Sequence, residues 1–271
     1  VRLELVNKVR AKCAAGILNA PDPSFNPAVD KDLARKFGPK DLVVGKKENK
    51  RYLQKKLGLI QDDHAPVFFW PSRLDPIQKG CQLLADIFYK VISKYWDQNL
   101  QIVFVANGDY QMVFRDIVNF HKIKKRVAIY DFSNRLEHLA YGAADFILMP
   151  SRFEPCGLPQ MIAPLYGTLP VAHDTGGIHD TITHLDVKKN TGNGFLFETF
   201  DANGLFWAIE QAMIFYNLPQ KAKAKQIKRI MLESRETFTH ANTAPQYIKL
   251  YEKMLERPLV VENRFDTSSA D

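Results

Sequence analysis

The sequence has few cysteines and no long apolar run. Its 271 residues include three cysteines, Cys13, Cys81 and Cys156. An odd number at wide spacing argues against a disulfide framework and against a cysteine-based zinc site. No apolar stretch approaches the roughly 18 residues that a membrane-spanning helix needs. We therefore expect a non-membrane protein of a reducing compartment, the cytoplasm or an organelle stroma.

The sequence also lacks internal repeats and low-complexity segments. It opens VRLELVNKVR, without an initiator methionine or an apolar signal core, as a fragment would, so the missing targeting signal is weak evidence. Hydrophobic residues make up 46% and charged residues 25%. These values are close to the globular average and exclude a disordered chain, a collagen-like fibre and a coiled coil.

Positive charge is in excess but scattered. The formal net charge is +7, and the lysines and arginines form short clusters spread over the whole chain. A nucleic-acid-binding stripe would gather them on one element with aromatic residues between them. Solvated helix faces explain the clusters more simply, so nucleic acid is an unfavoured partner. A small phosphate-bearing ligand needs only two or three well-placed cations.

From residue 65 onward, apolar runs alternate with amphipathic segments. The runs predict buried strands at 67–70, 101–105, 126–130, 145–150, 169–172 and 194–197. Helical patterns lie between them at 79–95, 110–121, 134–141 and 157–166, and further helices are predicted at 202–216, 220–236 and 244–255. An earlier helical pattern, 48–57, ends at Gly58 as at a C-cap. The fold class is therefore α/β: a Rossmann-like, doubly wound parallel sheet with C-terminal helices.

Ligands of such sheets bind at the carboxyl ends of the strands. The segments that follow the strands carry two cations, a carboxylate, an aromatic residue in a loop and two helix starts that contain glycine. These residues are Arg73, Lys79, Glu154, Phe132, Gly157 and Gly176-Gly177. Bare amides at a helix start bind phosphate oxygens, and an aromatic ring can stack on a base. A diphosphate, a base and a hydroxylated group would fill this set, and a nucleotide sugar has all three.

Each residue also has a plainer interpretation. Arg73 could be an ordinary surface arginine, Lys79 a first-turn lysine and Glu154 a charge that complements a helix dipole. Gly176-Gly177 could be only a tight turn, and Cys156 is better explained by packing than as a nucleophile. His173, His179 and His184 are spaced by six and five residues, which fits no usual metal pattern. The joint placement at one sheet edge is the stronger signal.

The segment Ser151-Arg152-Phe153-Glu154-Pro155-Cys156-Gly157-Leu158 resembles the signature of bacterial glycogen synthases and plant starch synthases. Other matching segments follow in the family's order. They are Gly16 to Asn19, Glu48 to Lys50, Tyr166 to Pro170 and Thr175 to Gly177. The resemblance spans about residues 16–255. It implies the C-terminal, nucleotide-sugar-binding half of a retaining enzyme with two Rossmann-like domains.

The resemblance also implies domain limits and residue roles. Residues 1–20 correspond to the remnant of an interdomain link, 21–257 to the nucleotide-sugar-binding domain with its C-terminal helices, and 258–271 to a disordered tail. The implied catalytic residues are Glu154, Arg73 and Lys79. The implied donor-binding residues are Phe132, Cys156, Gly157, Leu158, Thr175, Gly176 and Gly177. Neither a cofactor nor a metal is expected.

Four positions depart from the family's pattern. One extra residue separates Arg73 from Lys79, Pro159 replaces a common threonine, and Ala20 stands where the link has glycine. Ile162 occupies the position of a second carboxylate, an absence that is usual for this branch of the family. A double displacement through two close carboxylates is therefore disfavoured.

The implied activity is transfer of glucose from ADP-glucose or UDP-glucose to the non-reducing end of an α-1,4-glucan. The partners are the nucleotide sugar, the glucan and a first catalytic half that this sequence lacks, so the chain alone is expected to be inactive. The implied location is the cytoplasm of a bacterium or the plastid stroma of a plant. Two alternatives stay open: a related retaining transferase with another donor or acceptor, and a non-catalytic nucleotide-sugar-binding module.

Overall fold

The structure is a computed structural model that describes residues 2–259. These residues fall into two compact units, one formed by Pro21 to Thr237 and the other by the N-terminal residues up to Ala20 with those from Phe238 onward. The second unit contains α1 (Arg2–Arg10) and α10 (His240–Leu255). Within it, the Thr243 hydroxyl donates to the carbonyl of Leu18. The larger unit begins at Pro21 and does not include α10, and the functional domain limits stay predictions. Most of the predicted tail, 260–271, lies outside the described residues.

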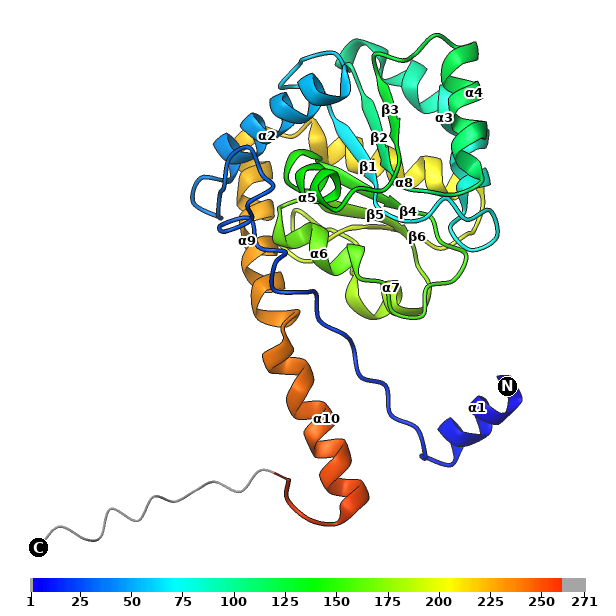
Figure 1. The fold of residues 1–271 in the computed structure, drawn as a ribbon, viewed down its shortest axis with the longest axis vertical. Coiled ribbons are helices and arrows are strands. Elements are labelled where there is room, and N and C mark those ends of the chain that lie inside the picture. Colours follow the sequence, from blue (N-terminus) through cyan, green and yellow to red (C-terminus); the bar gives the residue numbers. More distant parts are fainter. Residues whose placement is uncertain (1, 260–271) are drawn as a thin grey trace, which may run out of the picture. The chain divides into compact units, whose positions relative to one another are not determined.

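The larger unit is built on one six-stranded parallel sheet (Figure 1). Its strands are β1 (Val67–Trp70), β2 (Gln101–Val105), β3 (Val127–Tyr130), β4 (Phe146–Met149), β5 (Leu169–His173) and β6 (Phe195–Phe197). They lie in the order β3-β2-β1-β4-β5-β6, and every pair is parallel. This is the doubly wound Rossmann order, so the predicted fold class is confirmed.

Helices cover both faces of the sheet (Figure 1). One face packs on α3 (Cys81–Lys94), α4 (Tyr110–Phe120) and α8 (Ala202–Tyr216); the other packs on α2 (Leu42–Leu57), α5 (Asn134–Ala143) and α6 (Pro159–Leu165). Three further elements complete the unit: η1 (Trp96–Gln98), α7 (Gly176–Thr181) and α9 (Gln220–Thr237). Alternate residues of β1 show why the strands are apolar at every position. Phe68 and Trp70 enter one apolar core while Val67 and Phe69 enter the other, so a sheet buried on both sides needs continuous apolar strands.

Several predicted helix starts differ from the structure, and one of them is that of the helix predicted at 244–255, which begins at His240. The pattern at 48–57 belongs to a helix that begins at Leu42, and Leu42, Gly45 and Lys46 in its first turns are also buried. The apolar periodicity did not show this start, because Val43 and Val44 are exposed and Lys46 is a buried charged residue. The helix predicted from Gly157 begins at Pro159, because the backbone φ of Gly157 is +72° and a right-handed helix cannot include it. The C-cap at Gly58 is confirmed, with a left-handed φ of 69°. Within residues 2–259, none of the helices is both long and apolar enough to cross a membrane.

Candidate functional site

The segments after β1 and β4 meet at the carboxyl edge of the sheet. These two strands are neighbours in the middle of the sheet, and the chain leaves them toward opposite edges. Doubly wound folds bind their ligands at such a switch point. The backbones are tied there, since the N–H of Arg152 donates to the carbonyl of Gln78 at 2.8 Å and the Gln78 amide reaches the carbonyl of Phe153 at 3.4 Å.

Lys79 and Glu154 form a buried ion pair at this point. The Lys79 Nζ lies 2.5 Å from Oε2 of Glu154, and the two residues are only 9% and 7% exposed. The Ser151 hydroxyl donates to the same Oε2 at 3.2 Å. Neither hydrogen bond uses Oε1, the other carboxylate oxygen, and the ammonium has two further N–H groups. The pair can therefore bind a ligand and stay intact.

Close backbone contact explains why the two segments converge. Gly80 has a left-handed φ of 68°, and a Cβ there would lie 1.9 Å from the carbonyl oxygen of Pro150. A residue with a side chain would push the loop that carries Lys79 away from the loop that carries Glu154. The glycine therefore brings the ion pair together.

The segment after β5 closes on the same loop. The Gly177 N–H donates to the Glu154 carbonyl at 2.8 Å, and Cβ atoms on Gly176 and Gly177 would lie 2.2 Å from the carbonyl oxygen of Glu154 and 2.1 Å from that of Cys156. The sequence interpretation had these glycines offering free amides to a phosphate. For Gly177 that is wrong, because its N–H already bonds Glu154. The glycines fix the backbone that carries the carboxylate.

Arg73 and Phe132 lie on the same edge without a contact to the pair. Arg73 is exposed, and none of the ion pairs among residues 2–259 includes it. Backbone N–H donation from Gln78 holds the pKa of Asp75 below its ordinary value, and the charges of Arg73 and Lys79 lower it further. Both cations thus act on one carboxylate. Phe132 is 53% exposed, and its N–H donates to the Asn107 side chain at 2.9 Å. Among the described residues, no hydrogen bond joins Leu158 or Thr175 to the Lys79–Glu154 pair.

Three supporting residues escaped the sequence interpretation. Ser151 bonds the carboxylate, the buried Gln160 donates its amide to the Cys156 carbonyl at 2.7 Å, and His173 reaches the Ser151 carbonyl at 2.8 Å through Nδ1. Each holds the loop that carries Glu154. The available signal was their polarity: His173 is a polar residue that ends an apolar strand, and the other two lie in or beside the signature segment.

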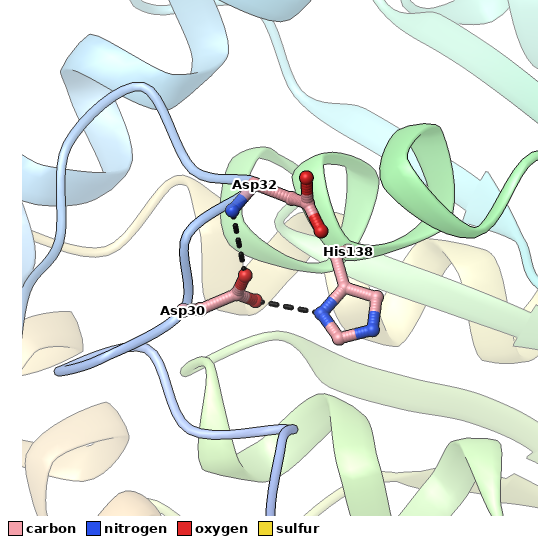
Figure 2. Close-up of side chains that lie close together, drawn as sticks. All are labelled: Asp30, Asp32 and His138. Atoms are coloured by element: carbon pink, nitrogen blue, oxygen red, sulfur yellow. Dashed lines mark hydrogen bonds and ion pairs between the residues drawn. The ribbon is translucent and has the colours of Figure 1, made fainter.

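One cluster has the composition of a metal site. Asp30, Asp32 and His138 place ligand atoms within 4.8 Å of one another (Figure 2). In the structure, however, Asp30 accepts the Asp32 backbone N–H at 2.9 Å, the Tyr166 hydroxyl at 2.5 Å and a contact from His138 Nδ1 at 2.8 Å. Burial alone would raise the pKa of Asp30, but the bonds from His138 and Tyr166 outweigh it and lower that pKa. These bonds give the cluster a structural role, as a tie between the segment before α2 and α5.

The model of the family described as "Glycosyl transferases group 1" matches residues 65–214, which include β1 to β6 and both loops of the ion pair. The chain belongs to this family. The region that matches is the Rossmann-like sheet with its helices, and the α/β fold inferred from the sequence is that of the family.

Individual relatives agree with the family match. A glycogen synthase of Bacillus cereus (strain Q1) is 33% identical over 245 residues, 89% of this chain and 49% of that protein. One of Anoxybacillus flavithermus is 34% identical over 257 residues, 94% of this chain and 51% of that protein. The catalytic domain of Arabidopsis thaliana starch synthase IV, solved with ADP and acarbose, has a TM-score of 0.83 and 33% identity, and covers 94% of this chain and 52% of that one.

The resemblance to glycogen and starch synthases is therefore confirmed for this glycosyltransferase chain. The chain spans about half the length of the curated relatives that it matches. The individual site residues remain predictions, supported by the geometry of the Lys79–Glu154 pair.

Proposed function

We propose that this glycosyltransferase chain is the donor-binding half of an α-1,4-glucan synthase. It binds ADP-glucose, and the whole enzyme transfers the glucose to the non-reducing end of the glucan with retention at the anomeric carbon. The observation that carries the proposal is the buried Lys79–Glu154 pair at the switch point of the sheet. The support for ADP as the nucleotide is that the starch synthase structure at 33% identity was solved with ADP.

In this proposal, Lys79 binds the diphosphate that leaves during transfer. The reaction develops negative charge on the diphosphate and positive charge on the sugar. An ammonium fixed beside the leaving group stabilises that negative charge without having to reorganise. Two N–H groups of Lys79 remain for the diphosphate while the third stays on Glu154. Arg73, exposed at the mouth of the same edge, adds a second positive charge.

Glu154 binds the glucose hydroxyls and stabilises the sugar cation. Oε2 is held by Lys79 and Ser151, so Oε1 is the oxygen that can accept a sugar hydroxyl. Its negative charge lies within one ion-pair distance of the cation that binds the leaving group. Ile162 stands where a second carboxylate would be, and it is buried. A covalent double displacement would need two carboxyl groups about 5–5.5 Å apart, so the single carboxylate favours a route without a glycosyl-enzyme intermediate.

Calorimetric titration of the 271-residue chain with ADP, ADP-glucose and UDP tests this proposal. We expect ADP and ADP-glucose to bind more tightly than UDP. Arg73→Ala should weaken ADP by about tenfold or more, because it removes a charge-assisted contact. Glu154→Gln should weaken ADP-glucose while leaving ADP nearly unchanged. Lys124→Ala, which removes an exposed lysine elsewhere, is the matched control.

The catalytic role needs the full-length enzyme. There, Glu154→Gln should lower turnover by about 10²–10³, the usual effect of losing one preorganised electrostatic contact. Turnover equal to the parent's would remove Glu154 from the mechanism. If the enzyme uses UDP-glucose in preference to ADP-glucose, the donor in this proposal is wrong and UDP-glucose takes its place. Binding of ADP-glucose by a full-length enzyme that makes no glucan would identify a binding module instead.

A further inference from the structure

A cavity lies at the opposite end of the sheet from the Lys79–Glu154 pair, at the amino ends of the strands. Its volume is 690 Å³, and it lies between α2, the start of β4 and the α8–α9 connection, all within the unit formed by Pro21 to Thr237. Asp145 and Phe146, where β4 begins, are part of its wall. The Lys79–Glu154 pair is at the carboxyl end of the same strands and contributes nothing to this lining.

Lys46 is buried in the wall of this cavity, and no carboxylate in the described part of the chain pairs with it. The residue is 8% exposed, and its ammonium donates to the Tyr166 carbonyl at 3.0 Å and the Thr168 hydroxyl at 2.8 Å. Both acceptors are neutral. An ammonium has three N–H groups, so one donor has no acceptor among the described residues.

Lys223 and Lys50 share the cavity wall with Lys46, and they differ in how fully they are bonded. The Lys223 ammonium donates to the Tyr216 carbonyl at 2.7 Å and lies 4.3 Å from the centroid of the Tyr216 ring. It therefore keeps two N–H groups. Lys50 has three acceptors: the Ala65 carbonyl, the Asp145 carboxylate at 2.7 Å and the Tyr216 hydroxyl. The spare donors belong to Lys46 and Lys223.

The local charge is also unbalanced. Burial lowers the pKa of Lys46 to about 7, and the charges that act on it are those of Asp145 and Lys50. Burial likewise lowers the pKa of Lys223, and the same two groups act on it. Three ammonium groups thus share one carboxylate, which leaves two positive charges when all three are protonated.

Two of the three remaining carboxylates of the wall, Asp62 and Asp63, have hydrogen-bond or ion-pair partners other than Lys46 and Lys223. Asp63 is paired with both Lys47 and Arg51. Asp62 accepts the His64 backbone N–H and the Asn99 side-chain amide, each at 2.8 Å. The charge of Asp97, a third carboxylate of the lining, acts on the pKa of Arg126. None of the three is among the charges that shift the pKa of Lys46 or Lys223.

We propose that this cavity is a second ligand site, which binds a small dianion through Lys46 and Lys223. A phosphate monoester carries about −1.5 to −2 charge at neutral pH and offers three acceptor oxygens, which match the two positive charges and the three spare donors. A small dicarboxylate has the same charge. Lys46 is on α2 and Lys223 is on α9, so the bound dianion links these helices. The site is independent of the proposed ADP-glucose site.

Calorimetric titration of the 271-residue chain with inorganic phosphate, succinate and chloride at equal ionic strength tests the proposal. We expect phosphate or succinate to bind and chloride not to bind. Lys46→Met and Lys223→Met should each weaken the dianion by tenfold or more. Lys47→Met is the matched control, because Lys47 lines the same cavity but is paired with Asp63. Arg73→Ala must leave this binding unchanged, which separates it from phosphate bound at the proposed ADP-glucose site. Circular dichroism verifies that each variant folds.

Proton uptake supplies a second readout. At pH 8 a lysine with a pKa of about 7 is mostly neutral, and a bound dianion favours its charged form. Binding should therefore take up a fraction of a proton, measured as a heat that depends on the ionisation enthalpy of the buffer. Lys46→Met should abolish that dependence. Three results overturn the proposal. They are no binding of either dianion, binding by the Lys46→Met and Lys223→Met variants as tight as that of the parent, or loss of binding in Arg73→Ala. Stronger binding of phosphate than of succinate identifies phosphate-ester chemistry, and the reverse identifies a dicarboxylate.

Discussion

The two ends of the sheet bury lysines in opposite ways. At the carboxyl end, Lys79 is 9% exposed and lies 2.5 Å from the Glu154 carboxylate. At the amino end, Lys46 is 8% exposed and has only a carbonyl and a hydroxyl as acceptors. Burial is the same, so the difference lies in the counter-charge. In a buried ion pair, each charge compensates the other. A buried ammonium without a counter-charge lowers the stability of the fold until it loses its proton or gains an anion.

The two ends also differ in how the chain reaches the site. The carboxyl end is built from loops pressed together at glycines, and Glu154 is held by Ser151 and by the backbone contacts of its loop. At the amino end, Lys46 and Lys223 are carried by two helices. Loops tied at several points hold one geometry, and the paired charges at the carboxyl end depend on it. At the amino end, Lys46 and Lys223 donate only to neutral carbonyl and hydroxyl groups among the described residues.

The largest effect is expected for Lys79→Met. The substitution keeps the aliphatic volume but leaves the Glu154 carboxylate buried, with Ser151 as its only side-chain donor among residues 2–259. Removing one partner of a buried pair typically lowers the free energy of unfolding by about 3–5 kcal/mol. Urea unfolding of the 271-residue chain measures the change.

The double variant Lys79→Met with Glu154→Gln is the control for this prediction. Without the carboxylate no buried charge is left unpaired, so much of the lost stability should return. If the single and double variants lose the same free energy, the pair is not what stabilises this edge.

Sequence patterns predicted the fold well because the signals are local. Continuous apolar strands such as Val67–Trp70, separated by amphipathic helices, require a parallel sheet that is covered on both faces. The topology then brought the loops with Lys79 and Glu154 to one edge, where they pair. The start of α6 was predicted wrongly because glycine adopts right-handed and left-handed backbone conformations with similar ease, and the sequence does not show that Gly157 has a φ of 72°.

Other features could not be inferred from a single sequence. The bond from Gly177 N–H to Glu154 joins residues 23 positions apart and depends on how two loops fit together. The lysine cavity needs α2 and α9 side by side, and these are separated by more than 160 residues. Lys46 and Lys223 look like any surface lysine in the sequence, because helix packing is what buries Lys46 and partly buries Lys223.

A smaller loss is expected for Gly80→Ala than for Lys79→Met. A Cβ at Gly80 would lie 1.9 Å from the Pro150 carbonyl oxygen, and the left-handed φ of 68° adds backbone strain. Strain and clash together should lower the free energy of unfolding by about 3 kcal/mol.

Gly58→Ala is the matched control, because Gly58 has a φ of 69° with nothing within 4 Å of the added Cβ. Only the backbone strain acts there, and it should cost about 1–2 kcal/mol. The difference between the two variants, measured by urea unfolding, isolates the close approach of the loops. Equal losses would mean that the loop after β1 can move away from Pro150 freely.

Near neutral pH the smallest effect is expected for Lys46→Met, and this effect grows as the pH rises. Below pH 7 both the folded and the unfolded chain carry a proton on Lys46, and between pH 7 and about 10.5 only the unfolded chain does. The unfolded chain therefore binds more protons in this window, so the parent's stability rises with pH there, by at most about 1.4 kcal/mol per pH unit. The variant lacks this rise. Near pH 6 the parent carries the cost of a buried charge, and the variant carries the loss of the two Lys46 hydrogen bonds. Because these costs offset each other, the two proteins should have similar stability there.

Thermal or urea unfolding of the parent and of Lys46→Met at pH 6, 7, 8 and 9 measures this difference. We expect the parent to gain about 1 kcal/mol over the variant between pH 7 and pH 8. Adding a dianion that fills the cavity should reduce the gain, since the anion keeps Lys46 protonated in the folded chain as well. Parallel pH profiles for the two proteins would show that Lys46 has an ordinary pKa, and the contrast between the two ends of the sheet would then rest on hydrogen bonding alone.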